Sequence, residues 1–536
     1  MTSAAAPPSV ASAAPAASVR PSLRGPAIRR RGVPTLLAAA GGLALYLAFP
    51  SHDLSLLAVL GPAALSLVVY GRGVRAGGWL GFVFGLAYLT PLLSWTGVYV
   101  GAWPWLLLAL WQAGYLALLG PALVLVQRLP LWPLWAACLW VADEALRSRW
   151  FLGGFPWGRL GVSQADSPFT AYAAYGGVPL LSLTVALCGT LLAAALVGAT
   201  RATRSAPPAA AGLLAAALAV PAVGALLPVS AGTDASSASA VIAVVQGDVP
   251  EPGLDFNARR RAVLDNHVDQ TIALAARVEA GVDPRPDLVI WPENASDIDP
   301  FRNADAAEQI DRAARAVGVP ILVGAVVVND DDTLGNVGIV WDPLTGPGQT
   351  YLKRHPVPFG EYIPFRSLLE RVAPIVNEVP RDFVGGDRPG LLDAGGVSVG
   401  DVICFEVAYD GLVGDVVDAG AQVLVVQTNN ATFGYTDETY QQLAMGQIRA
   451  VEHGRSVLVA STSGVSAIIA PDGSVSQQSG LFTPDVFVQA VELRTDRTLA
   501  SRLGSTPEWS LTAAGATALA IALWRSRRRP SQGVAQ

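Results

Sequence analysis

Three side chains in the C-terminal half of this chain could together carry out acyl transfer: Glu293, Lys353 and Cys404. Cys404 lies in GDVICFEVAYD, and a cysteine thiolate is a strong nucleophile that can form a thioester. Glu293, in LVIWPENAS, could accept the thiol proton and then serve as acid and base for the leaving and incoming groups. Lys353, in YLKRHPVPFGEY, could hold positive charge where a tetrahedral oxyanion develops.

Lys353 is the only lysine among 36 basic residues. An ammonium is a compact charge whose pKa responds to burial, whereas the wider guanidinium stays protonated. The simpler alternatives are a surface lysine kept by chance, a capping role for Glu293 and a core thiol at Cys404, but the three together fit a catalytic set better. His355 is a minor candidate for the same site, and His453 is expected to complement a helix dipole instead.

The elements that must position these residues begin at Ala240, where short β-branched runs alternate with helical stretches. This alternation predicts an α/β domain with its sheet covered on both faces, and catalytic groups at the carboxyl ends of strands. Lys353 is expected after a strand and a turn at 345–348. The expected strands are 241–245, 288–291, 321–328, 337–341, 397–403, 423–427, 457–461 and 466–470, and the expected helices are 259–280, 306–317, 412–419 and 439–453.

Apolar runs precede and follow this domain. The chain is 52% hydrophobic and only 15% charged, and a bilayer-spanning helix takes about 20 apolar residues. Eight candidate spans are Pro34–Phe49, Leu54–Tyr70, Gly78–Val98, Trp103–Val126, Leu131–Leu146, Tyr172–Val197, Ala209–Val229 and Leu511–Trp524. The sequence therefore predicts a multi-pass α-helical membrane bundle of about eight spans joined to an α/β domain.

The charges favour one orientation. Arginines gather in the N-terminal arm, in alternate loops and in the tail, which places both termini in the cytoplasm. We expect residues 1–33 to be a disordered arm, 34–230 a membrane domain of about seven helices and 231–507 an extracytoplasmic catalytic domain. Residues 508–525 would be the last transmembrane helix and 526–536 a cytoplasmic tail. One loop is an exception, because it carries Arg147, Arg149 and Arg159 although this orientation places it outside.

Composition also limits the kinds of partner and cofactor that we expect this chain to bind. Residues 231–507 hold thirty-seven carboxylates against nineteen basic residues, a net charge of −18, which disfavours nucleic acid as a partner. Of the three cysteines, Cys138 and Cys188 lie in apolar runs, so the α/β part has no disulfide framework. The Cys and His residues lack metal-ligand spacing and there is no specific phosphate loop, so neither a metal nor a cofactor is expected.

The motifs resemble those of the apolipoprotein N-acyltransferase family of the carbon–nitrogen hydrolase (nitrilase) superfamily. The similarity extends over most of the chain, from about Pro34 to Trp524. Its stretches are GGFPWGRLGVSQ (153–164), VVQGDV, WPENA, LKRHPVPFGEYIPFR, ICFE, TNNATFG and QIRAVEHGRS. The resemblance implies an αββα sandwich for the α/β domain.

The resemblance also assigns site residues. It places the family's catalytic glutamate, lysine and cysteine on Glu293, Lys353 and Cys404, and accessory, substrate-binding glutamates on Glu361 and Glu406. This sequence departs from the family at Phe405, where tyrosine is frequent. It also departs at Phe256, where the family has tryptophan, and at Thr432, where an aromatic residue is common.

The implied reaction is a two-step acyl transfer. A phospholipid would donate an acyl chain, from sn-1, to Cys404, and the α-amine of an S-diacylglyceryl cysteine at a lipoprotein's N-terminus would then attack the thioester. The partners would be a phospholipid donor, a diacylated apolipoprotein acceptor and the lipid bilayer, with no nucleic acid. The enzyme would be a monomer in the bacterial plasma membrane, and a dry site would protect the thioester from water.

The segment Val357–Val376 is apolar, broken by prolines and linked directly to Lys353. We expect it to be a flap that touches the bilayer and admits acyl chains, and the alternative is an ordinary core loop. Aspartate in place of Phe365 and Leu368 would then impair turnover of lipid more than that of a soluble ester.

Two other functions remain open at this point. A membrane-tethered nitrilase-type amidase would release free acid to water, but it would need only a single anchor. A scaffold with a catalytically dead domain would not need an intact Glu293, Lys353 and Cys404.

Overall fold

The computed structural model describes residues 1–2, 27–98, 100–200, 207–229, 238–249, 260–370, 376 and 379–528. Three features expected from the sequence lie wholly or partly outside this part of the chain: the N-terminal arm, Phe256 and residues 371–375 of the segment 357–376. The side chain of Leu368 and the tail from 529 also lie outside it.

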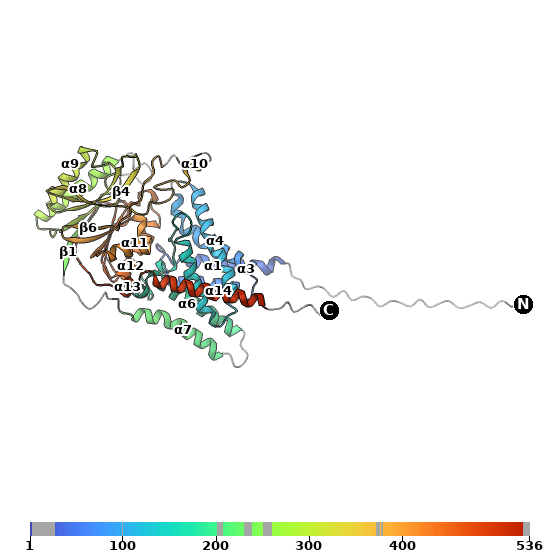
Figure 1. The fold of residues 1–536 in the computed structure, drawn as a ribbon. Coiled ribbons are helices and arrows are strands. Elements are labelled where there is room, and N and C mark those ends of the chain that lie inside the picture. Colours follow the sequence, from blue (N-terminus) through green and yellow to red (C-terminus); the bar gives the residue numbers. More distant parts are fainter. Residues whose placement is uncertain are drawn as a thin grey trace.

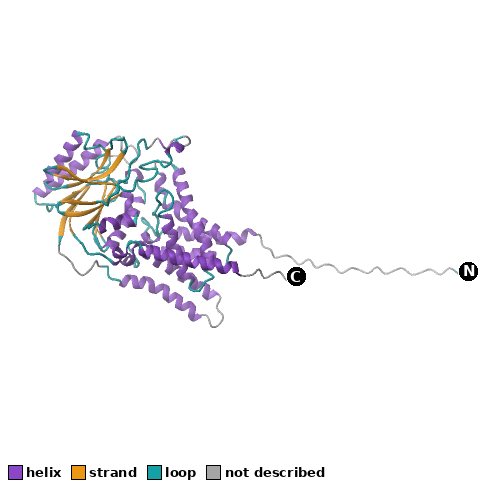
Figure 2. Cartoon of the chain, viewed as in Figure 1, coloured by secondary structure: helices purple, strands orange, loops and turns teal. Residues whose placement is uncertain are grey.

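Helices make up one body of the molecule, and strands gather in the other (Figure 2). Each of the eight predicted spans coincides with helical structure: α1 (Ala27–Tyr46), η1–α2 (Ser55–Val69), α3 (Val74–Leu92), α4 (Ala102–Val126), α5 (Trp132–Arg147), α6 (Ala173–Thr200), α7 (Pro207–Leu226) and α14 (Thr506–Arg528). By length and composition, three described helices could cross a membrane: Ala102–Val126, Thr170–Thr200 and Pro208–Leu226. Two shorter apolar helices, Gly32–Tyr46 and Ser55–Val69, accompany them.

The last helix returns to the bundle after the α/β part. Helix α14 packs against α5, and a Cβ atom built on Gly515 would lie 3.1 Å from the carbonyl oxygen of Cys138. A side chain at 515 would push the two helices apart, so glycine permits their close approach.

The second body contains two six-stranded sheets. The first has the order β12-β1-β2-β3-β4-β5 and the second β11-β10-β9-β8-β7-β6. The strands are β1 (Ser239–Gln246), β2 (Leu288–Ile290), β3 (Ile321–Val328), β4 (Leu334–Asp342), β5 (Gly346–Leu352), β6 (Leu391–Ala394), β7 (Val397–Ile403), β8 (Val423–Thr428), β9 (Val457–Ser461), β10 (Ala467–Ile469), β11 (Val475–Gln478) and β12 (Asp485–Glu492). Strands β1, β2 and β3 run parallel in the first sheet, and β7, β8 and β9 run parallel in the second. Within each set of three, the carboxyl ends of the strands therefore lie at the same edge of the sheet.

The layers are helix, sheet, sheet, helix. Helices α8 (Arg260–Glu279) and α9 (Ala304–Val317) share a core with the first sheet. A second core lies between the sheets and includes Ile242, Leu322, Val399 and Val425. Each sheet is therefore covered on both faces, as expected, by helices on one face and by the other sheet on the opposite face, and the domain has two such sheets. The αββα sandwich implied by the resemblance is confirmed.

The outer layer of the second sheet merges with the helical bundle. Helices α11 (Asp410–Asp418) and α12 (Glu438–His453) share one continuous core with the bundle. Helix α12 and the short α13 (Leu499–Leu503) lie next to α6 (Figure 1). The two bodies are thus joined through a common apolar interior rather than by a linker alone.

Candidate active site

Glu293 follows β2, with Pro292 between it and the end of the buried Leu-Val-Ile-Trp run, and its side chain is nearly buried. Its Oε1 atom accepts hydrogen bonds from Lys353 Nζ at 3.0 Å and from Asn336 Nδ2 at 2.6 Å. Its Oε2 atom accepts the backbone N–H of Asn429 at 2.8 Å. Three donors therefore hold the carboxylate of Glu293 in one orientation.

Lys353 directly follows β5 and is 1% exposed. The turn before it lies at 343–345 and not at 345–348 as expected. The strand Gly346–Leu352 was missed, because Gly-Pro-Gly-Gln gives little β signal. Lys353 Nζ also donates to Glu361 Oε1 at 2.9 Å. Burial alone would lower the pKa of Lys353, but the carboxylates of Glu293 and Glu361 hold it well above its usual value. The side chain is therefore a fixed positive charge.

Cys404 ends the β7 segment and opens a short 3₁₀ turn, Cys404–Ala408. Its backbone φ of 53° lies in the left-handed region, which non-glycine residues rarely adopt and which is found at functional turns. Gln442 Nε2 donates to Sγ at 3.7 Å. Although the residue is partly exposed, burial of the thiol raises its pKa, as does the charge of Glu293, while Lys353 opposes them.

These interactions bring the three predicted residues into one cluster. Glu293 and Lys353 follow two strands of the first sheet, β2 and β5, and Cys404 follows β7 of the second. The charges of Glu293 and Lys353 act on the thiol of Cys404. Because the thiol of Cys404 is protonated at rest, nucleophilic attack requires a base that takes its proton during the reaction. Glu293 is a carboxylate suited to that task.

Glu361 and Glu406 support the cluster in different ways. Glu361 accepts Lys353 Nζ and Asn336 Nδ2 on Oε1 and the backbone N–H of Val357 on Oε2, at 2.6 Å. Glu406 is fully buried, and its carboxylate accepts hydrogen bonds from the phenol of Tyr351 and from the backbone N–H groups of Ile403, Arg354 and His355. Three of these four donors are backbone N–H groups, so Glu406 holds the backbone on both sides of the site in place.

The sequence did not indicate four polar residues that contact this site. Asn336 on β4 donates to both Glu293 and Glu361. Gln442 and Glu438 on α12 lie near Cys404, and Asn429 holds Glu293 through its backbone. A polar residue inside the apolar run LGNVGIVWD is the one cue that could have identified Asn336.

Phe405 is buried under aromatic rings from the membrane part. Its ring is stacked on Trp157 with centroids 5.7 Å apart and an interplanar angle of 5°, and Phe155 is 5.7 Å away. The indole of Trp157 donates to Gln441 Oε1 at 2.6 Å. The motif segment 153–164 therefore lies directly against the residue that follows Cys404.

The pKa values of the two candidate histidines, His355 and His453, are both lowered. Burial and the charge of Lys353 lower the pKa of His355, whose ring lies 4.2 Å from that of Tyr409. Burial lowers the pKa of His453 to about 3, with further lowering by nearby arginines. The predicted charge of His453 at the end of α12 is therefore wrong, and its Nδ1 atom lies 2.9 Å from Ser501 Oγ instead.

The described part of the predicted flap contains a turn and one short helix, α10 (Arg366–Leu369). Phe359 and Phe365 are 55% and 65% exposed on it. Large exposed aromatic side chains on the segment that follows Lys353 suit contact with an apolar partner.

Comparison with known proteins matches each of the two bodies to a protein-family model. Residues 41–191 match the family model "Apolipoprotein N-acyltransferase N-terminal domain", and residues 242–500 match "Carbon-nitrogen hydrolase". An apolipoprotein N-acyltransferase of Mycolicibacterium smegmatis is 44% identical over 94% of this chain and 87% of its own length. One from Azotobacter vinelandii is 35% identical over 84% of this chain and 88% of its own.

An amidase structure from Nesterenkonia sp. aligns with 52% of this chain and 100% of its own, at 20% identity and a TM-score of 0.37. The relatives, by contrast, match across both the helical body and the sandwich that holds Glu293, Lys353 and Cys404. By that match the chain belongs to the apolipoprotein N-acyltransferase family and is an acyltransferase.

Proposed function

We propose that this enzyme moves an acyl chain from a membrane phospholipid to the N-terminal amine of an S-diacylglyceryl-cysteine apolipoprotein, through a thioester on Cys404. The observation that carries the proposal is the buried cluster of Glu293, Lys353 and Cys404, set beside an outer layer that shares its core with the helical bundle. A lipid-processing site needs that proximity, because both substrates reside in the bilayer.

The first step forms the thioester. Glu293 accepts the Cys404 proton as the sulfur attacks the ester carbonyl of the phospholipid, and Lys353 stabilises the oxyanion that develops. The tetrahedral intermediate collapses, the C–O bond breaks, and Glu293 returns the proton to the leaving oxygen. A lysophospholipid is released and the acyl chain stays on sulfur.

The second step forms the amide. The α-amine of the apolipoprotein attacks the thioester carbonyl, Glu293 takes a proton from the amine, and Lys353 again stabilises the oxyanion. The C–S bond breaks and the proton passes from Glu293 to the sulfur, which restores Cys404. The Phe405–Trp157 stack narrows the access of water, which would otherwise hydrolyse the thioester.

We further propose the membrane arrangement. Residues 34–230 and 508–525 would form the multi-pass membrane domain of a plasma-membrane monomer, with residues 231–507 outside and residues 1–33 and 526–536 in the cytoplasm. The distribution of loop arginines supports this orientation. Residue-specific labelling of single cysteines placed in the loops, from either side of intact cells, tests it.

Mass spectrometry of the intact protein tests the chemistry. After exposure to phospholipid, the wild-type chain should gain one acyl mass on Cys404, and Cys404→Ser should gain none. Adding a diacylated peptide should discharge the adduct and yield an N-acylated peptide. Undiminished N-acylation by Cys404→Ser would refute the proposal, and fatty acid without N-acylated peptide would indicate an amidase-like hydrolase.

A further inference from the structure

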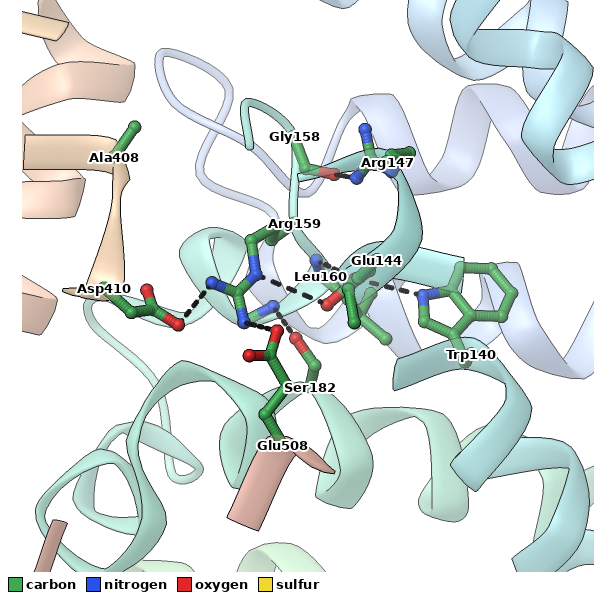
Figure 3. A network of polar contacts seen from close by, with 12 residues as sticks. Trp140, Glu144, Arg147, Gly158, Arg159, Leu160, Ser182, Ala408, Asp410 and Glu508 are labelled. Atoms are coloured by element: carbon green, nitrogen blue, oxygen red, sulfur yellow. Dashed lines mark hydrogen bonds and ion pairs between the residues drawn. The ribbon is translucent and has the colours of Figure 1, made fainter. Parts of the chain in front are cut away.

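A buried polar network joins the helical bundle to the turn that carries Cys404 (Figure 3). Its centre is Arg159, a loop residue only 3% exposed. Arg159 Nη1 donates to Asp410 Oδ2 at 2.6 Å, and Asp410 is the first residue of α11. From the opposite side, Arg449 Nη2 donates to Asp410 Oδ1 at 2.7 Å. One carboxylate thus receives a guanidinium from each body of the molecule.

Arg449 also holds the end of the nucleophile turn. Its Nε atom donates to the carbonyl of Val407 at 2.9 Å, and its Nη2 atom donates to that of Ala408 at 3.1 Å. These carbonyls end the five-residue turn that begins at Cys404. Because the left-handed backbone of Cys404 is disfavoured on its own, it persists only where the surrounding structure fixes it.

The bundle fixes the other end of the network. Glu144 of α5 accepts the backbone N–H of Leu160 at 2.6 Å, and its second oxygen lies 3.7 Å from Arg159 Nε. Arg147 donates to the carbonyls of Trp157 and Gly158 at 2.9 Å and 2.6 Å. The backbone on either side of Arg159 is therefore held rigidly by α5, so the guanidinium reaches Asp410 from a fixed base.

Asp410 is paired with two positive charges. Burial alone would raise the pKa of Asp410, but Arg159 and Arg449 hold it below its usual value. The Asp410 side chain is 23% exposed, and it depends on both guanidiniums, because removing one partner leaves charge poorly compensated. Loss of Arg159 would thus loosen Asp410 and, with it, the alignment of Arg449 on the Cys404 turn.

We propose that Arg159 is a positioning residue for the acyl transfer, acting through Asp410 and Arg449 to hold Cys404 in its reactive conformation. The membrane part then completes the catalytic centre as well as bringing lipid to it. This inference rests on the proposed role of Cys404 as nucleophile. A simple adhesive role between the two bodies would lower stability but leave the rate per folded molecule unchanged.

The test uses the full-length enzyme in detergent micelles with p-nitrophenyl butyrate, a soluble ester that needs no lipid contact. The burst of p-nitrophenol reports thioester formation, and rates are normalised to folded protein. Arg159→Met should lower the maximal burst rate about 10- to 100-fold, as expected for a displaced nucleophile, with the half-saturating ester concentration unchanged. Arg159→Lys, which keeps the charge, should recover part of that loss.

Arg302→Met is the matched control, because Arg302 forms an Arg–Asp pair with Asp330 at 3.2 Å on the exposed surface. It should react like the wild type. An unchanged burst rate per folded molecule in Arg159→Met, or an equal loss in Arg302→Met, would overturn the inference.

A milder variant covers the case in which Arg159→Met does not fold. Asp410→Asn keeps the shape and removes the charge, so it should also slow the burst, and a wild-type rate in it would overturn the inference. Combining it with Arg159→Lys should add little further loss, since both act on one contact. A burst that survives in Cys404→Ser would refute the proposed function itself, whatever the Arg159 variants do.

Discussion

The carboxylate of Glu406 accepts the backbone N–H of Arg354 at 2.7 Å, which links the residue after Lys353 to the turn that begins at Cys404. The same carboxylate accepts the N–H of Ile403 at 2.8 Å, just before the nucleophile. One buried side chain therefore sets the spacing between the strand ends that carry the ammonium and the thiol.

Glu406→Gln tests this spacing. A glutamine keeps the size but offers one oxygen where two are used, so its NH₂ group would face a backbone N–H donor. Leaving a buried donor unpaired costs about 1–3 kcal/mol, and we expect a comparable loss of unfolding free energy with at least a roughly tenfold slower acyl-enzyme burst. Glu492→Gln, on an exposed part of β12, should change neither. A full burst rate in Glu406→Gln would show that the spacing is set elsewhere.

The pH dependence of acylation should reflect Glu438, which opens α12 beside the site. It is 2% exposed and accepts Asn430 Nδ2 at 2.6 Å. Burial raises the pKa of Glu438 to about 8, against the effect of that hydrogen bond. Below this pH the side chain is neutral, and above it the new negative charge raises the pKa of the Cys404 thiol and opposes attack.

The burst rate of the wild type should therefore fall as pH rises through about 8. Glu438→Gln, neutral at every pH, should lose this fall while keeping the rate at pH 7. Rates at saturating soluble ester, from pH 6 to pH 10, would decide it. A fall that persists unchanged in Glu438→Gln would assign it to another group.

Much of the fold could be predicted because burial leaves a clear pattern. The strand that precedes Glu293 is a continuous aliphatic run, Leu-Val-Ile, and the one that precedes Cys404 has four β-branched residues within Val397–Ile403 and is mostly buried. Such runs are typical of central parallel strands, and both strands were placed correctly. Strand β5, which leads to Lys353, is largely exposed and begins Gly-Pro-Gly, so its sequence resembles a loop. The other strands that were missed, β6, β11 and β12, also lie at sheet edges and carry polar residues.

The residues of the site could be predicted from local motifs, but the contacts between distant segments could not. The motifs around Glu293, Lys353, Glu361, Cys404 and Glu406 predicted residues that the structure does bring together. The contacts of Arg159 with Asp410 and of Trp157 with Phe405 join a membrane-side loop to a distant turn. Such pairs depend on how two bodies pack, and nothing local in either segment indicates the partner.

Stability should depend on the protonation of Asp401, a fully buried residue on β7. Within the described part of the chain, neither its carboxylate oxygens nor Gln427 Oε1 has a hydrogen-bond partner. A Cβ atom built on Gly338 would lie 2.1 Å from Asp401 Oδ2 and 3.0 Å from Gln427 Oε1. These two acceptor oxygens therefore lie close to the same position. Burial, with the charges of Glu406 and Glu293, raises the pKa of Asp401 well above its usual value.

The folded protein therefore binds this proton more tightly than the unfolded chain, and stability is lost as pH rises above about 4, the pKa of an unfolded aspartic acid. Asp401→Asn is neutral throughout, so its Tm should exceed that of the wild type by a margin that widens between pH 5 and pH 8. Thermal unfolding across that range, with Asp387→Asn on the exposed surface as control, measures the margin. A margin independent of pH would mean that Asp401 is ionised in the folded protein.

Phe365 offers a test of lipid entry. Its ring is 65% exposed on the segment that follows Lys353, next to α10. Burying a phenylalanine in an apolar phase is worth about 1.5–3 kcal/mol, so Phe365→Asp should lower acyl-enzyme formation from phospholipid about tenfold or more, at 1.4 kcal/mol per tenfold. The burst with p-nitrophenyl butyrate should stay near the wild-type rate, since that ester reaches Cys404 through water. Leu344→Asp, at the far end of β5 and 93% exposed, should affect neither reaction. Equal losses with both substrates in Phe365→Asp would instead assign the segment to the architecture of the site.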